Sequence, residues 1–186
     1  MAIDTSSAEP SAQALRADKP SLRAYLAVGV FLSAVSAGIA AISHGAEPGP
    51  RASDAVLAPM GALVALTAVV WLVMVVVRNV AVLRGRIDAR QFVHYAGRDF
   101  DERIERPART FNNLFQVPLL FYVACLAMMI LARVDAAQLQ LAWLFVGLRG
   151  THAAVYIGWN HVPTRFATWI AGCLVLGAIW TRLVFP

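Results

Sequence analysis

The segment from Arg106 to Tyr122 reads RPARTFNNLFQVPLLFY and passes from a charged stretch into an apolar one. On a helix, Arg109, Asn113 and Gln116 stand at i, i+4 and i+7, which places their side chains on one face. The uncharged run that follows is typical of a membrane span, so these polar groups are expected at its entrance. Because lipid offers no hydrogen-bond partners, they must face protein or a ligand. We predict that they form the floor of a small polar site.

The composition of the whole chain indicates an integral membrane protein. Of its 186 residues, 59% are hydrophobic, and the mean hydropathy is +0.63; soluble domains are usually less than half apolar. The net charge is +5, and arginines gather between Arg78 and Arg109, where they are mixed with aspartates and glutamates. A mixed-sign loop between apolar spans indicates membrane topology rather than a nucleic-acid surface, so no nucleic-acid partner is predicted.

The order of apolar segments predicts an all-α helix bundle in the lipid bilayer. Residues 1–23 are polar and aperiodic and are predicted to be a flexible N-terminal tail. The predicted transmembrane spans are 24–43, 55–77, 112–132, 139–158 and 166–185. Pro118, near the start of the third span, removes a backbone donor and is predicted to kink that helix.

The first apolar segment has an alternative interpretation as a cleaved signal peptide. The apolar part of a signal peptide is usually about 7–15 residues long. The segment 24–43 is longer and follows a long polar tail. A retained membrane helix is therefore favoured.

The distribution of positive charge predicts the orientation. Five spans place the N-terminal tail, the arginine-rich loop and the turn with Arg165 on one side of the membrane. The loop 44–54, the turn 133–138 and the C-terminus fall on the other side with one arginine each. The positive-inside rule makes the first side cytoplasmic.

The cysteines and histidines give no sign of a metal site. Cys125 and Cys173 both lie inside apolar runs, and the four histidines lack ligand spacing. We predict that the cysteines are packing residues and that the chain holds no metal and no disulfide.

A second polar pattern lies in the fourth predicted span. Arg149, His152, Tyr156 and Asn160 stand at i, i+3, i+7 and i+11, which is one stripe of a helix. A lone arginine near the bilayer centre costs roughly 2.5–3.5 kcal/mol on insertion scales, so the stripe should face the bundle interior or a neighbouring subunit. The polar face in the third span is its expected complement.

Two structural explanations of this stripe remain open. The side chains could only hold helices together by hydrogen bonds, and Arg149 could form a structural salt bridge. The predicted spans contain no aspartate or glutamate, which favours an anionic ligand. Arg78, which ends the second predicted span, either extends to the headgroups or completes such a site.

The pattern Arg109-x3-Asn113-x2-Gln116-x-Pro118-x2-Phe121 resembles the MAPEG superfamily, the membrane-associated proteins in eicosanoid and glutathione metabolism. In the family pattern a glutamate occupies the position of Gln116. The run LAWLFVGLRGTHAAVYIGWN, residues 141–160, is similar to the family's third span, especially in bacterial members. The resemblance covers roughly residues 55–186.

The resemblance implies a four-helix MAPEG-like membrane domain at 55–186, with 24–43 as one extra N-terminal transmembrane helix. It implies a homotrimer in the bacterial inner membrane. Glutathione would bind between subunits near the cytoplasmic face as a co-substrate. It would be conjugated to lipophilic small molecules or used to reduce their peroxides.

The resemblance also implies roles for single residues. Substrate-binding positions would be Arg109, Asn113, Gln116 and His152, and catalytic positions would be Arg149, Tyr156 and Arg78. Adjacent arginines favour the thiolate of a thiol, which is the nucleophilic form. The amide at position 116 cannot form the charge-assisted bond to the ligand's ammonium that a glutamate would form.

Two other functions remain as alternatives. A non-catalytic membrane protein on the same fold, binding another anionic lipid or a partner, is favoured by Gln116. A small transporter or channel subunit is suggested only by the polar residues within spans, and the chain lacks the paired acids or broken-helix repeats that ion coupling often leaves.

Overall fold

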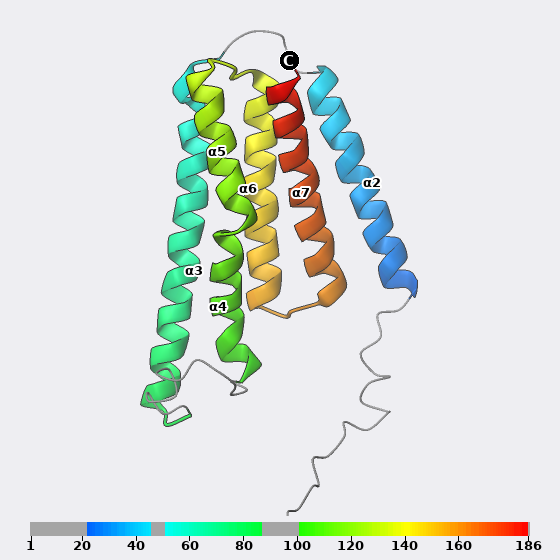
Figure 1. Ribbon diagram of the computed structural model, residues 1–186. Coiled ribbons are helices and arrows are strands. Elements are labelled where there is room, and N and C mark those ends of the chain that lie inside the picture. The colour runs from blue at the N-terminus through cyan, green and yellow to red at the C-terminus, as the bar shows by residue number, and fades with distance from the viewer. Residues whose placement is uncertain (1–21, 46–50, 87–100, 186) are drawn as a thin grey trace, which may run out of the picture.

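The computed structural model describes residues 22–45, 51–86 and 101–185, and these are helical apart from short connections (Figure 1). The elements are α2 (Leu22–Gly45), the 3-10 helix η1 (Ser53–Val56), α3 (Leu57–Leu83), α4 (Glu102–Leu114), α5 (Val117–Ile130), α6 (Ala136–Ile157) and α7 (Val162–Val184). The predicted all-α fold is confirmed for this part of the chain. Almost all of the predicted tail, residues 46–50 of the predicted loop 44–54, and residues 87–100 of the arginine-rich loop lie outside the described residues.

Four helical stretches of the described chain are long and apolar enough to cross a membrane. They are Leu22–Gly45, Ser53–Leu83, Glu102–Ile130 and Val162–Val184. The remaining predicted span, 139–158, is helix α6, which is not among them because its polar stripe lowers its hydropathy. This helix contacts α2, α3, α4 and α7, so protein rather than lipid covers much of its surface.

The third predicted span, 112–132, differs in its boundaries and is interrupted. It begins ten residues earlier, at Glu102, and is broken between Leu114 and Val117. Gln116 there has φ −93° and ψ −95°, outside the helical region. Pro118 falls in the first turn of α5, where a missing amide donor costs no helical hydrogen bond. The predicted kink is therefore confirmed, and the span that contains it runs over Glu102–Ile130 rather than 112–132.

The second predicted span also continues further than its apolar run. Helix α3 extends past Arg78 to Leu83. The Arg78 guanidinium lies 3.4 Å from the Glu105 carboxylate of α4. Because the Glu105 carboxylate neutralises the Arg78 guanidinium, α3 can continue past this charged residue.

The packed core is formed by α3, the α4–α5 pair, α6 and α7. Phe121 of α5 and Phe145 of α6 are both fully buried and stack with their ring centroids 4.7 Å apart. Such aromatic pairs contribute about 0.5–1.5 kcal/mol beyond their area burial. Helix α2 lies alongside α7 (Figure 1) and has no buried residue. It is thus a peripheral helix added to a four-helix core.

Candidate functional site

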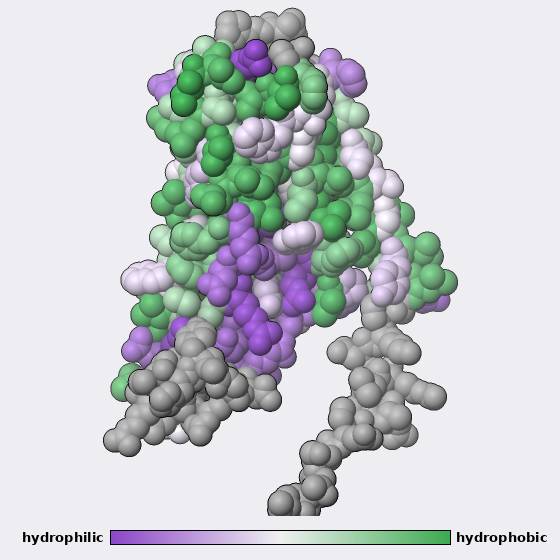
Figure 2. Space-filling model, in the orientation of Figure 1, coloured by the Kyte–Doolittle hydropathy of each residue, from purple (hydrophilic) through white to green (hydrophobic). Residues whose placement is uncertain are grey.

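Helix α4 is amphipathic and carries a polar face at the end of the bundle away from the C-terminus. Glu102, Arg106, Arg109 and Asn113 stand at i, i+4, i+7 and i+11, so their side chains share one side of the helix. The Asp101 carboxylate begins the helix by accepting a hydrogen bond from the backbone N–H of Arg103 at 3.0 Å. We use the name α4 polar face for Glu102, Arg106, Arg109, Asn113 and Gln116. In Figure 2 a hydrophilic area covers the part of the bundle where α4 lies, and the surface above it is hydrophobic.

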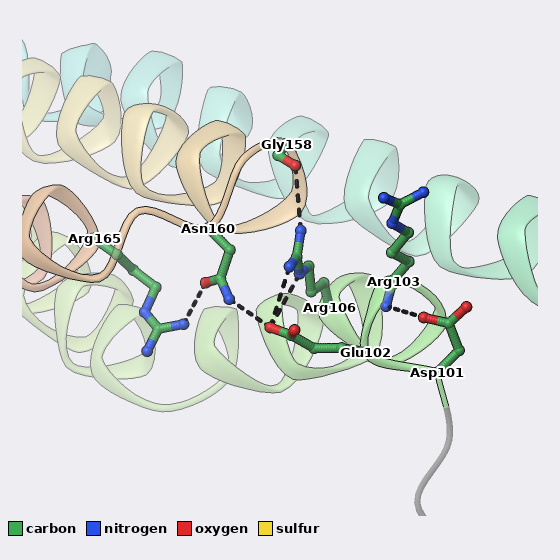
Figure 3. Close-up of polar contacts among 7 residues, drawn as sticks. All are labelled: Asp101, Glu102, Arg103, Arg106, Gly158, Asn160 and Arg165. Carbon is green, nitrogen blue, oxygen red and sulfur yellow. Dashed lines mark hydrogen bonds and ion pairs between the residues drawn. The ribbon is translucent and has the colours of Figure 1, made fainter. Parts of the chain in front are cut away.

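A hydrogen-bond network joins the start of α4 to the turn between α6 and α7. Figure 3 shows the Glu102 carboxylate between two donors, Arg106 at 3.2 Å and the Asn160 amide at 2.6 Å. Arg165 donates to the side-chain oxygen of Asn160, and Arg106 donates to the Gly158 carbonyl at 3.4 Å. The network fixes the orientation of the α4 polar face relative to α6 and α7.

Asn160 does not extend the predicted helical stripe. Helix α6 ends at Ile157, and Asn160 has φ +50°, a left-handed conformation that asparagine tolerates better than most residues. Of the two roles considered for it, helix packing and a turn, the structure shows the turn.

Arg149 faces the interior of the bundle, as its position in the apolar span predicts. The residue is 2% exposed, and its guanidinium lies 5.0 Å from the ring centroid of Phe145. Its Nη2 lies 3.9 Å from Cys173 Sγ on α7, and a Cβ at Gly172 would come within 2.9 Å of the same nitrogen. No ion pair involves Arg149 among the described residues, and its Nε has no hydrogen-bond partner there.

The expected complement of Arg149 is therefore wrong within one protomer. The guanidinium contacts α7, where a glycine leaves room for it, rather than the α4 polar face. Helix periodicity indicates correctly that the stripe points into protein, but it does not indicate which neighbouring helix lies opposite.

His152 and Tyr156 continue this contact toward the α6–α7 turn. His152 is 5% exposed, and its Nδ1 lies 3.0 Å from the Arg165 carbonyl oxygen. Because a carbonyl can only accept, Nδ1 carries the proton and Nε2 is an acceptor, which has no partner among the described residues. The half-buried ring of Tyr156 lies 4.3 Å from the Arg165 guanidinium.

The predicted glutathione contacts on α4 are accessible. Arg109 and Gln116 are exposed and Asn113 is half-buried. The side chains of these three residues make no hydrogen bond to another described residue. Gln116 lies in the break before α5, so it does not continue the regular i+7 spacing from Arg109. Arg78 pairs with Glu105, which stands four residues before Arg109, so it borders this face from α3.

Comparison with known protein families matches residues 56–185, well over half of the chain, to the MAPEG family. The chain belongs to the MAPEG family. No curated protein and no solved structure matches it. The family match begins at Val56 and leaves α2 outside, in agreement with the peripheral position of that helix.

This MAPEG protein also has an apolar cavity beside the break that holds Gln116. The cavity, about 450 Å³, lies between α3 and the α4–α5 pair. Its lining includes Trp71, Phe111, Phe115 and Tyr122, and Phe115 directly precedes Gln116. A lipophilic molecule in this cavity would lie close to the break in the α4–α5 pair.

Sequence reasoning about this MAPEG chain identifies Asn160 but not the other side chains of the network. In the sequence alone, Arg165 and Arg106 are charges that indicate topology, and Glu102 is one acid of a mixed-sign loop. The i, i+4 spacing of Glu102 and Arg106 is a signal for an ion pair on a helix. No spacing indicates that the pair meets Asn160, 58 residues later in the chain.

Proposed function

We propose that this MAPEG protein binds glutathione at the α4 polar face and transfers it to lipophilic electrophiles, or uses it to reduce their peroxides. The observation that carries the proposal is that Arg109, Asn113 and Gln116 are polar, accessible and without hydrogen bonds to other described residues. Family membership supports glutathione as the ligand. A guanidinium such as Arg109 can hold a carboxylate of the tripeptide by two parallel hydrogen bonds.

The proposed chemistry depends on positive charge near the thiol. A free thiol has a pKa near 8.5, and neighbouring guanidinium groups favour its thiolate. Arg165 and Tyr156 stand at the α6–α7 turn that the network ties to α4. Arg149 and His152 are buried within the bundle. Arg149 would contribute a positive charge that no described acidic group neutralises, and His152 would contribute a ring whose proton is held on Nδ1. Arg78 would act from the α3 side.

The lipophilic reactant would occupy the apolar cavity between α3 and the α4–α5 pair. Aromatic side chains line it, and one of them, Phe115, directly precedes Gln116 in the chain. Holding thiol and electrophile side by side replaces an encounter in solution, which contributes strongly to rate.

We propose further that the protein works as a homotrimer whose subunits complete the site. Helix α5 directly follows Gln116 of the α4 polar face and exposes large apolar side chains, including Leu119, Leu120 and Leu126. A neighbouring copy could cover both surfaces. We also propose that the N-terminus and the arginine-rich loop lie in the cytoplasm and that the membrane is the bacterial inner membrane.

The direct test is a glutathione titration of the purified protein in detergent by calorimetry. We expect binding, and we expect Arg109→Ala to weaken it about tenfold to a hundredfold, since a hydrogen bond to a charged group contributes about 1.5–3 kcal/mol. Arg51→Ala, an exposed arginine outside the α4 polar face, is the matched control and should leave binding unchanged. An absence of heat at millimolar glutathione would exclude the proposal.

A second candidate function is favoured by Gln116, which stands where the family has a glutamate. The protein would then be a non-catalytic member of the same fold that binds another anionic lipid or a partner. If glutathione is the ligand, Gln116→Glu should strengthen its binding about fivefold through a charge-assisted bond to the ammonium. A variant that gains neither binding nor conjugation would support the non-catalytic alternative.

A further inference from the structure

A second polar cluster lies at the α5–α6 turn and the end of α7. In Figure 1 this is the end of the bundle where the C-terminus lies. It surrounds a cavity of about 280 Å³ between the α5–α6 turn, the first turn of α6 and the end of α7. The polar side chains that line this cavity are Arg133, Asp135, Gln138 and Arg182. None of them belongs to the proposed glutathione site, so this cavity requires its own explanation.

Hydrogen bonds hold the walls of this cavity in place. The Asp135 carboxylate accepts from the backbone N–H of Gln138 at 2.7 Å and pairs with Arg182 at 2.9 Å. Arg182 also donates to the Ser43 carbonyl of α2 at 3.2 Å, and Arg133 donates to the Leu183 carbonyl at 2.8 Å. Both carboxylate oxygens are thus engaged, and the polar walls are preorganised.

Two groups in these walls lack partners. Gln138 is 2% exposed; its amide nitrogen donates to the Ile179 carbonyl at 3.3 Å, while its Oε1 accepts from no described residue. The Arg182 Nε likewise has no described acceptor. The walls of the cavity therefore contain one buried unmatched acceptor and one buried unmatched donor. Two guanidinium groups line the cavity beside a single carboxylate, which pairs with Arg182.

We infer that this cavity binds the headgroup of a membrane phospholipid that carries a hydrogen-bond donor beside its phosphate, such as ethanolamine or glycerol. The phosphate would lie against Arg133 and Arg182, which balances the excess positive charge. The ammonium or hydroxyl of the headgroup would donate to Gln138 Oε1. A choline headgroup cannot do so, because its nitrogen carries three methyl groups and no hydrogen.

The bilayer is the source that the surrounding surface favours over a soluble phosphate compound. Large apolar side chains next to the cavity are exposed, namely Ile130 at 82%, Leu131 at 53% and Phe185 at 76%. Acyl chains that leave a headgroup in the cavity would cover these side chains. A free phosphate ester would leave them uncovered.

The test uses the full-length protein, delipidated in detergent and titrated with phosphatidylethanolamine, phosphatidylglycerol or phosphatidylcholine. Thermal unfolding and native mass spectrometry report binding. We expect the first two lipids to bind about fivefold more tightly than phosphatidylcholine, the difference expected from one net hydrogen bond. Gln138→Leu should remove this preference, whereas Gln140→Leu, on the exposed side of the same helix, should retain it.

Two further measurements keep the inference open to refutation if Gln138→Leu does not fold. Arg133→Gln, at an exposed position, should weaken the binding of phosphatidylethanolamine and phosphatidylglycerol. Free phosphoethanolamine should raise the unfolding temperature far less than the lipid. Equal binding of phosphatidylcholine, or an equal effect of free phosphoethanolamine, would overturn the inference. Loss of glutathione binding in Arg109→Ala would not bear on it, since the two sites share no residue.

Discussion

At the scale of single residues, the Arg149 guanidinium occupies a space that exists only because residue 172 is a glycine and has no side chain. A methyl group there would lie 2.9 Å from Nη2 and 3.2 Å from Cζ, closer than such atoms normally approach. Arg149 is 2% exposed and cannot move away without disturbing α6 or α7.

We therefore expect Gly172→Ala to destabilise the protein by about 1–3 kcal/mol, the usual cost of overpacking a core. Thermal unfolding in detergent measures the change. Gly177→Ala on the same helix is the control, because a Cβ there meets nothing within 4 Å. Since alanine is the better helix former, the control should be neutral or slightly stabilising. Equal unfolding temperatures for the two variants would contradict the claim that the Arg149 guanidinium needs a glycine at position 172.

The sequence predicted the burial of Arg149 but not its partner. The prediction followed from the energy of a charge in lipid, which applies to any arginine in an apolar span. The guanidinium packs against Gly172 and reaches Cys173 Sγ, and neither a glycine nor a cysteine in an apolar run is a signal for an arginine contact. The carbonyl partner of His152 belongs to the backbone of Arg165 and is equally invisible in the pattern of side chains.

At the scale of helices, the break between α4 and α5 determines where Gln116 points. The spacing of residues 109, 113 and 116 suggested a single helical face, and Pro118 suggested a kink. A proline indicates that a break occurs nearby but does not fix the residue at which the chain departs from helical geometry. Here that residue is Gln116 itself, with ψ −95°.

Replacing the proline tests this relation. In Pro118→Ala an amide becomes available to continue the helix, so we expect hydrogen exchange of amides 115–117 and 119 to slow and glutathione binding to weaken as Gln116 turns. Pro107→Ala, which removes a proline inside α4 where the helix is unbroken, should leave exchange at 115–117 and 119 as it is. Unchanged exchange in the first variant would mean that packing, rather than the proline, maintains the break.

The start of α4 shows why helices at a membrane surface are hard to locate from the sequence. Spans such as α3 and α7 could be placed because lipid demands continuous apolar runs. Residues 102–111 of α4 are rich in charge and resemble a loop in composition. Their helix is supported by contacts with the distant α6–α7 turn, at Gly158 and Asn160, which local composition does not encode.

At the scale of the whole molecule, α2 is separable from the four-helix core. It has no buried residue, and the family match begins only at Val56. In lipid there is little hydrophobic gain when one apolar helix packs against another, because acyl chains are as apolar as the side chains.

Removal of residues 1–45 should therefore leave the core folded. We expect the unfolding temperature to fall by about 2–4 °C at most, which corresponds to about 1 kcal/mol in a domain of this size. The chief loss is the bond from Arg182 to the Ser43 carbonyl. Full-length protein unfolded in parallel serves as the reference. A shortened chain that aggregates or loses its helical circular dichroism would show that α2 is required for the core.

The central position of α6 also has a consequence for biogenesis. Its Arg149 is covered by α7, which leaves the ribosome later, and until then an arginine at mid-membrane costs roughly 2.5–3.5 kcal/mol. Helix α6 is the one membrane-length helix of the core that falls short of the hydropathy of a span within the described residues. We therefore expect the translocon to release α6 and α7 into lipid together, as a hairpin whose second arm shields the charge of the first.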